Sequence, residues 1–316
     1  MKFLYLLEKI RNPFLDTFFS LITHIGEETV FLVFALVFFW CVSKREGYYM
    51  LISGLVGTVI NQAMKLIFKI PRPWVRDPAF KPIESAIPEA TGYSFPSGHT
   101  QNVSTTFGTV GRYSSRKWVR IAAVTVIVLV AFSRMYLGVH TPLDVGVSLL
   151  IGAVLVFALY PLFSTEARFD KFMPYVVAAS AILSLGLLLF VFLMPSEGVD
   201  AANLASGMEN ASTLFGCTLA LIPVYLIDRK YIKFQTDGKW YSQIIKLVLG
   251  LGVVLAIKVG LSTPLEVLFG NEYVARCVRY FLIVMFAGAV WPLTFKFFSR
   301  LKISALDNLF KKKNET

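Results

Sequence analysis

The pair His140 and Asp144 has the residue types and the spacing of a histidine held by a carboxylate. Between them, Thr141 and Pro142 suit the N-cap and the first position of a helix, which would place Asp144 in the first helical turn. A carboxylate that accepts a hydrogen bond from one ring nitrogen fixes the tautomer and leaves the other nitrogen as a nucleophile. The alternative for Asp144 is an ordinary first-turn acid, favoured by the helix dipole.

The run Pro96-Ser97-Gly98-His99 is typical of a helix start that faces an anion. Ser97 suits an N-cap, and Gly98 lets a ligand approach the backbone. Free amides at a helix N-terminus bind anions, and His99 would stand beside them. The alternative is a capped helix with a histidine at the membrane interface.

Three cationic residues lie near the ends of apolar segments. Arg72 follows Lys65 by about two helical turns, and Arg134 stands near the end of a later segment. A guanidinium binds phosphate through two parallel hydrogen bonds, and an ammonium adds a point charge. Each cation alone is equally consistent with a side chain that snorkels to the interface. Together with the two histidines, however, they predict one anion-binding site.

The composition indicates a membrane protein that must position these residues. Hydrophobic residues make up 56% of the 316 residues and charged residues only 16%, against about 25% in soluble domains. The net charge of +11 comes from short basic runs between apolar stretches, which excludes a nucleic-acid surface in favour of membrane topology. The three cysteines have no metal-ligand spacing, and no cleavable signal peptide is expected at the start.

We therefore predict an all-α, polytopic membrane helix bundle with about nine transmembrane helices. Residues 1–26 are expected to form an amphipathic interfacial segment. The segment 99–113 is polar, so it should face protein rather than lipid. The predicted spans are 27–43, 48–69, 99–113, 118–137, 142–163, 173–194, 208–227, 242–261 and 277–297.

The basic loops predict the orientation of the bundle. Lysine and arginine residues recur in alternate loops, including the C-terminal tail with Lys311 to Lys313, and such loops are cytoplasmic. Nine spans then place the N-terminus outside and the C-terminus in the cytoplasm. The proline-rich loop 70–98 would lie outside, on the same side as all the candidate site residues, and loops this long usually carry function.

At three motifs, Lys65–Pro73, Pro96–His99 and Ser133–Asp144, the sequence resembles the type 2 phosphatidic acid phosphatase superfamily. This family includes lipid phosphate phosphatases, undecaprenyl pyrophosphate phosphatases and glucose-6-phosphatase. The resemblance covers about residues 27–163, and it divides the chain into the segment 1–26, a phosphatase core 27–165 and a transmembrane extension 166–316. Segment 210–216 and the span pattern are weakly similar to glucose-6-phosphatase.

The resemblance implies a role for each motif residue. His140 would attack phosphorus to form a phosphohistidine, Asp144 would orient His140, and His99 would protonate the leaving oxygen and then activate water. The phosphate would be bound by the residues Lys65, Arg72, Ser97, Gly98 and Arg134. The family needs no metal and no cofactor for this reaction.

The substrate stays open between two kinds of phosphate. The first is a lipid phosphomonoester or pyrophosphate, cleaved at the extracytoplasmic surface of an integral membrane protein, which we expect in a bacterial plasma membrane. The second is a small soluble phosphate such as a sugar phosphate. A third possibility is a non-catalytic membrane protein with a vestigial motif. The lipid bilayer is an expected partner, and nucleic acid is not. The sequence does not predict the oligomeric state.

Overall fold

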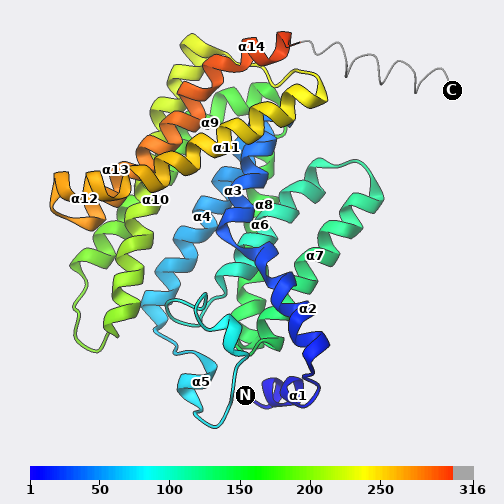
Figure 1. The fold of residues 1–316 in the computed structure, drawn as a ribbon, viewed down its shortest axis with the longest axis vertical. Coiled ribbons are helices and arrows are strands. Elements are labelled where there is room, and N and C mark those ends of the chain that lie inside the picture. The colour runs from blue at the N-terminus through cyan, green and yellow to red at the C-terminus, as the bar shows by residue number, and fades with distance from the viewer. Residues whose placement is uncertain (302–316) are drawn as a thin grey trace.

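The structure, a computed structural model, describes residues 1–301, and this range contains helices and no strand, which confirms the predicted all-α fold (Figure 1). The basic tail 302–316, with Lys311 to Lys313, lies outside the described residues. The first helices are α1 (Lys2–Lys9), α2 (Pro13–Thr23), α3 (Glu28–Val37), α4 (Lys44–Phe68), α5 (Pro73–Arg76), α6 (Gly98–Tyr113) and α7 (Lys117–Tyr136). They are followed by α8 (Pro142–Phe163), α9 (Glu166–Leu193), α10 (Ala201–Ile227), α11 (Trp240–Gly260), α12 (Ser262–Phe269), α13 (Glu272–Met285) and α14 (Phe295–Arg300).

Short 3₁₀-helical and π-helical segments extend several of these helices. They are η1 (His24–Gly26), η2 (Phe38–Val42), η3 (Glu84–Ala86), η4 (Asp228–Ile232), η5 (Phe286–Val290) and η6 (Trp291–Thr294). Many helices begin at a side chain that accepts a backbone N–H, which satisfies one of the free donors of the first turn. These capping residues are Asn12, Ser43, Ser97, Thr141, Thr165, Asp200 and Asn271.

Within residues 1–301, seven helical segments are long and apolar enough to cross a membrane. The pair Pro13–Gly26 and Glu28–Val42, bent by 50°, adds an eighth if it forms one span. The predicted span 99–113 becomes α6, which has only 16 residues and is not among these segments. The predicted number of about nine is therefore approximate.

Helix α6 is polar because it is enclosed by protein. It packs against α4, α7 and α8, and its polar side chains Thr100, Gln101, Ser104 and Thr105 are buried. Several of its hydroxyls donate to carbonyls of the preceding turn, as Ser104 does to Thr100. The expectation that this segment faces protein rather than lipid is confirmed.

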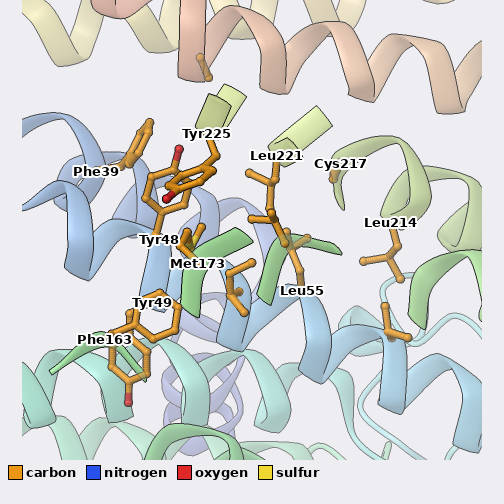
Figure 2. Packing of buried hydrophobic residues seen from close by; sticks show 14 of the residues in the cluster. Phe39, Tyr48, Tyr49, Leu55, Phe163, Met173, Leu214, Cys217, Leu221 and Tyr225 are labelled. Carbon is orange, nitrogen blue, oxygen red and sulfur yellow. The ribbon is translucent and has the colours of Figure 1, made fainter. Parts of the chain in front are cut away.

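Helix α4 is the common element of the core and the extension. It packs against α6 and α8 on one side and against α9 and α10 on the other. Figure 2 shows Tyr48 and Tyr49 of α4 among buried residues of α8, α9 and α10. Because α4 has 25 residues, it is about 37 Å long and runs through the whole bundle.

The two ends of α4 differ in chemistry. At its start, Lys44 pairs with Asp228 at 2.6 Å and Arg45 with Glu166 at 3.1 Å, so three loops meet there. At its other end lie Lys65, the long loop after α4, and α1 (Figure 1). The basic loops thus gather at one end of the bundle, and the candidate site lies at the opposite end with the N-terminus.

Candidate active site

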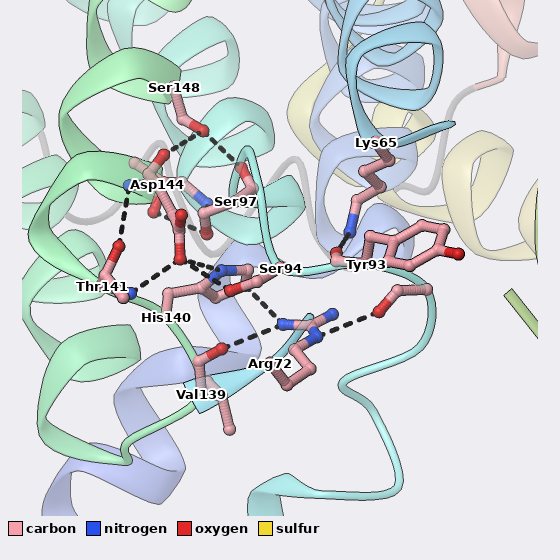
Figure 3. Close-up of polar contacts among 12 residues, drawn as sticks. Lys65, Arg72, Tyr93, Ser94, Ser97, Val139, His140, Thr141, Asp144 and Ser148 are labelled. Atoms are coloured by element: carbon pink, nitrogen blue, oxygen red, sulfur yellow. Dashed lines mark hydrogen bonds and ion pairs between the residues drawn. The ribbon is translucent and has the colours of Figure 1, made fainter. Parts of the chain in front are cut away.

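The predicted site residues come together where four helix ends meet (Figure 3). Helices α4 and α7 end there, and helices α6 and α8 begin there. A pocket of about 250 Å³ opens between them. Its walls are formed by Glu27, Glu28, Gln62, Lys65, Arg72, Glu89, Thr91, Gly98, His99, Asn102, Arg134, His140, Ser206 and Asn210.

His140 and Asp144 lie together as the sequence predicts. Nδ1 of His140 is 3.5 Å from Oδ2 of Asp144, and both side chains are buried. Asp144 also accepts from the backbone N–H of Thr141 at 2.7 Å, as part of a capping box that starts α8. The carboxylate therefore caps the helix and faces the histidine at the same time.

Ser94 holds the same carboxylate and was missed by the sequence analysis. Its buried hydroxyl donates to Oδ2 of Asp144 at 2.7 Å. Ser94 lies in the long loop, fifty positions before Asp144, without a helical or strand-like pattern around it. Only the short distance along the chain to the Ser97–His99 motif could have drawn attention to it.

The second ring nitrogen of His140 faces the cations. Nη1 of Arg72 donates to Nε2 of His140 at 2.9 Å, which fits a ring that carries its proton on Nδ1. Burial, and then the neighbouring Arg72 guanidinium, lower the pKa of His140 well below its usual range, although contact with Asp144 acts in the opposite direction. His140 is therefore a neutral imidazole at neutral pH, and its Nε2 lone pair accepts from Arg72 at the wall of the pocket.

Backbone carbonyls of the long loop hold two of the three cations. Lys65 donates to the carbonyl of Tyr93 at 2.6 Å, and Arg72 donates to the carbonyls of Thr91 at 2.7 Å and Gly92 at 3.1 Å. Both cationic side chains are buried. The loop thus brings acceptors to the positions where an anion would supply oxygen atoms.

Arg134 reaches the same pocket from the end of α7. It is 1% exposed, and its Nη1 donates to the hydroxyl of Thr23 at 2.6 Å, while its Nε has no hydrogen-bond partner among the described residues. Its own carbonyl accepts from the backbone N–H of His140 at 3.2 Å. Arg134 therefore positions His140 through its backbone and offers a free donor through its side chain.

The residues of the Ser97–His99 motif take different positions. Ser97 caps α6 as predicted, but its buried hydroxyl is occupied by Thr100 and it does not line the pocket. Gly98 does line the pocket, and a Cβ built on it would meet no atom within 4 Å. His99 lies beside Gly98, with its Nε2 3.8 Å from a carboxylate oxygen of Glu89.

Three residues outside the motifs group at the rim of the pocket. The ligand atoms of His24, Glu27 and Glu89 lie within 4.8 Å of one another, and this set could hold a metal ion. The sequence analysis missed this set because Glu89 is far from the other two in the chain. Such acid-rich groups at a surface are common without a metal, so the expectation of metal-free chemistry stays a prediction.

The extension also contributes to the pocket. Ser206 and Asn210 of α10 line it opposite the motif residues, together with Gln62 of α4. The nearby ion pair of Arg276 with Glu209, at 3.0 Å, joins α13 to the same part of α10. The sequence analysis did not predict that these neutral polar residues would line the pocket, because they have no charge to mark them.

Residues 46–168 match the model of the PAP2 superfamily, and residues 210–304 match the PAP2 superfamily phosphatase, transmembrane extension. The chain therefore belongs to the PAP2 superfamily, as the resemblance at the three motifs implied. More particularly, it is a PAP2 chain that carries the transmembrane extension, which here supplies α11, α13 and most of α10.

Several curated proteins are similar to this chain. It is 35% identical to an undecaprenyl-diphosphatase of Sulfolobus acidocaldarius over 133 residues, which is 42% of this chain and 63% of that protein. It is 24% identical to lipid phosphate phosphatase delta of Arabidopsis thaliana over 285 residues, 85% of this chain and 65% of that protein. It is 27% identical to sphingosine-1-phosphate phosphatase 1 of Mus musculus over 274 residues, 80% of this chain and 61% of that protein.

The chain thus spans a little under two thirds of the length of these three relatives. No solved structure matches the chain significantly.

A change of Gly98 to alanine tests whether the start of α6 binds an anion. Because no protein atom lies within 4 Å of the added methyl group, the thermal stability should not fall. The methyl group should hinder the approach of phosphate to the backbone and weaken orthovanadate or phosphate binding by about tenfold to a hundredfold, the effect of one hydrogen bond to a charged group. Calorimetric titration of the purified protein measures this affinity.

Gly146→Ala is the matched control, since Gly146 has equally open surroundings in α8 but does not line the pocket. Equal affinities of the two variants would contradict an anion site at the start of α6.

Proposed function

We propose that this protein hydrolyses the phosphomonoester of a membrane lipid through a phosphohistidine formed on His140. The observation that carries the proposal is the position of His140. It is a buried, neutral histidine between Asp144 and Arg72, at the wall of a pocket that also holds Lys65 and Arg134. A neutral nucleophile surrounded by fixed cations suits attack on an anionic phosphate.

In the first half-reaction, the phosphate oxygens take over the donors of Lys65 and Arg72 from the loop carbonyls. They also take over Nη1 of Arg72, which frees the lone pair on Nε2 of His140. Nε2 of His140 then attacks phosphorus, and the bond from phosphorus to the ester oxygen breaks. The protonated form of His99 gives that oxygen a proton and becomes neutral. Asp144 stabilises the positive charge that develops on the His140 ring.

In the second half-reaction, His99 takes a proton from water, and the resulting hydroxide attacks the phosphorus of the phosphohistidine. The bond between phosphorus and Nε2 breaks, inorganic phosphate leaves, and His140 returns to its neutral form. The reaction needs no metal in this scheme, because Lys65, Arg72 and Arg134 neutralise the charge of the phosphate.

The extent of the similarities favours a lipid monoester as substrate. Two of the three relatives described above are matched over 80% or more of this chain, and they are named for lipid phosphates and sphingosine-1-phosphate. The undecaprenyl-diphosphatase is matched over 42% only. Undecaprenyl pyrophosphate and hexose phosphates are therefore the comparison substrates.

Replacement of His140 by alanine tests the reaction and its intermediate. Phosphate release from a lipid monoester should fall by at least about a thousandfold, because the nucleophile is lost. An acid-labile radioactive phosphoenzyme, trapped by rapid quenching, should disappear with it. EDTA should leave the wild-type rate unchanged.

His24→Ala is the control, because His24 is the histidine outside the three motifs, and this variant should still form the phosphoenzyme. A phosphoenzyme that persists in His140→Ala would refute the assigned nucleophile, and loss of activity in EDTA would refute the metal-free scheme. Faster turnover of pyrophosphate or hexose phosphate than of every lipid monoester would refute the substrate class.

The pH dependence of kcat/KM follows from the lowered pKa of His140. The reactive form of His140 is the neutral ring, so its contribution to catalysis is lost when the pH falls through this lowered pKa. The acidic limb of kcat/KM, which reports the free enzyme, should therefore lie clearly below about 6.5, the ordinary value for histidine. A limb at or above that value would show that burial and Arg72 do not control the titration.

We also propose that the site faces the extracytoplasmic side. The basic loops gather at the end of the bundle opposite the site, and such loops are usually retained in the cytoplasm. The bacterial plasma membrane and the cytoplasmic C-terminus, expected from the sequence, stay predictions.

Cysteine labelling in intact cells tests this orientation. Ser85→Cys in the long loop and Ser115→Cys in the loop between α6 and α7 are matched, exposed positions at opposite ends of the bundle. In a background without the three native cysteines, an impermeant maleimide should label position 85 at once and position 115 only after the cells are opened. The reverse pattern would place the site in the cytoplasm.

A further inference from the structure

An apolar cavity of about 310 Å³ lies between the PAP2 core and the extension. Its walls come from α3, α4, α10, α11 and α13. Three of these helices, α3, α4 and α10, also line the phosphate pocket. The volume lies at the lower end of the range for small-molecule sites, about 300–1,000 Å³.

On each shared helix, the residues of the pocket are followed by the residues of the cavity. Along α4, Gln62 lines the pocket and Leu55 lines the cavity, about 10 Å further into the bundle. Along α10, Asn210 lines the pocket and Cys217 the cavity, again about 10 Å apart.

Along α3 the residue that lines the pocket and the first residue that lines the cavity are adjacent in the sequence. Glu28 lines the pocket, Thr29 lines the cavity, and the cavity continues along the same helix to Leu36, about 10 Å beyond Thr29. The three helices therefore lead from the phosphate pocket into the cavity within about two helical turns.

The lining of the cavity is polar only at the end near the pocket. Lys258 of α11 lies close enough to Glu28 to interact with it electrostatically. Further in, the walls consist of residues such as Leu55 and Leu221, which Figure 2 shows facing one another between α4 and α10. This order of polar and apolar groups matches an amphiphile with its anionic end at the pocket.

The cavity also reaches the apolar outer surface of the bundle. Leu32 of α3 and Leu255 of α11 both line it and are 42% and 60% exposed at the bundle surface. A hydrocarbon chain can therefore enter sideways, between α3 and α11, without leaving an apolar environment.

We propose that this cavity binds the hydrocarbon chain of the substrate while its phosphate lies against His140. The preferred substrate is then a phosphomonoester of a long, single-chain lipid, and the transmembrane extension is the part of the protein that recognises the chain. This inference rests on the proposed function, because it requires the pocket to bind a phosphate ester.

Filling the cavity from α11 tests the proposal. In Val254→Trp, the larger ring occupies the cavity from a helix that contributes no residue to the phosphate pocket. In nanodiscs, the ratio of kcat/KM for hexadecyl phosphate to that for butyl phosphate should fall by at least about tenfold, since binding energy from a remote chain contributes to catalysis. Val259→Trp, on the same helix but 69% exposed and outside the cavity, should keep the wild-type ratio.

A photoreactive diazirine at the end of a hexadecyl phosphate gives a second, independent measurement. In the wild-type protein, labelling should fall on residues of α10, α11 and α13 that line the cavity, and unlabelled hexadecyl phosphate should compete with it. An unchanged ratio in Val254→Trp, labels only on outward-facing residues, or labels without competition would each overturn the proposal. Hydrolysis of butyl phosphate that depends on His140 would show that the proposed function stands in that case.

Discussion

The structure depends on how three cations are kept together in one buried pocket. Lys65, Arg72 and Arg134 repel one another, and burial removes the water that would screen them. The fold offsets this in two ways. Carbonyls of the long loop accept from Lys65 and Arg72, and the C-terminal ends of α4 and α7, which carry partial negative charge, support Lys65 and Arg134.

The other two helix ends complete this arrangement with the opposite polarity. Helices α6 and α8 begin at the site, and their free amides and partial positive charge favour an anion near Gly98 and the carboxylate of Asp144. Two helix ends that support cations and two that support anions thus face one pocket. This explains why the four helices must converge. It also explains why α6 lies inside the bundle, since its polar residues could not face lipid.

Much of this site could be predicted from the sequence because its signals are local. The caps at Ser97 and Thr141, and the spacing of His140 and Asp144, are visible within five residues. Other contributions act over long distances or through the backbone. Ser94 reaches Asp144 across the fold, and the carbonyls of residues 91–93 have no side-chain signature. That Ser97 would not line the pocket could not be predicted either, because residue type alone does not distinguish a capping hydroxyl from one that binds phosphate.

The extension could be recognised as transmembrane, but its role could not be predicted, because apolar periodicity does not reveal which helices leave a space between them. Apolar periodicity also gave no sign that α10 would bring Ser206 and Asn210 to the pocket. Those positions depend on the packing of α10 against α4, α9 and α13.

The carboxylate of Asp144 has a consequence for how such a protein can change over time. One oxygen serves the start of α8, the hydroxyl of Ser94 and the ring of His140. A substitution that removes this oxygen therefore also loosens the start of the helix that carries it. Asparagine keeps an oxygen that can accept from the N–H of Thr141 while it loses the charge that supports His140. Descendants that have lost the activity but kept the fold should therefore vary at this position toward residues that can still cap the helix.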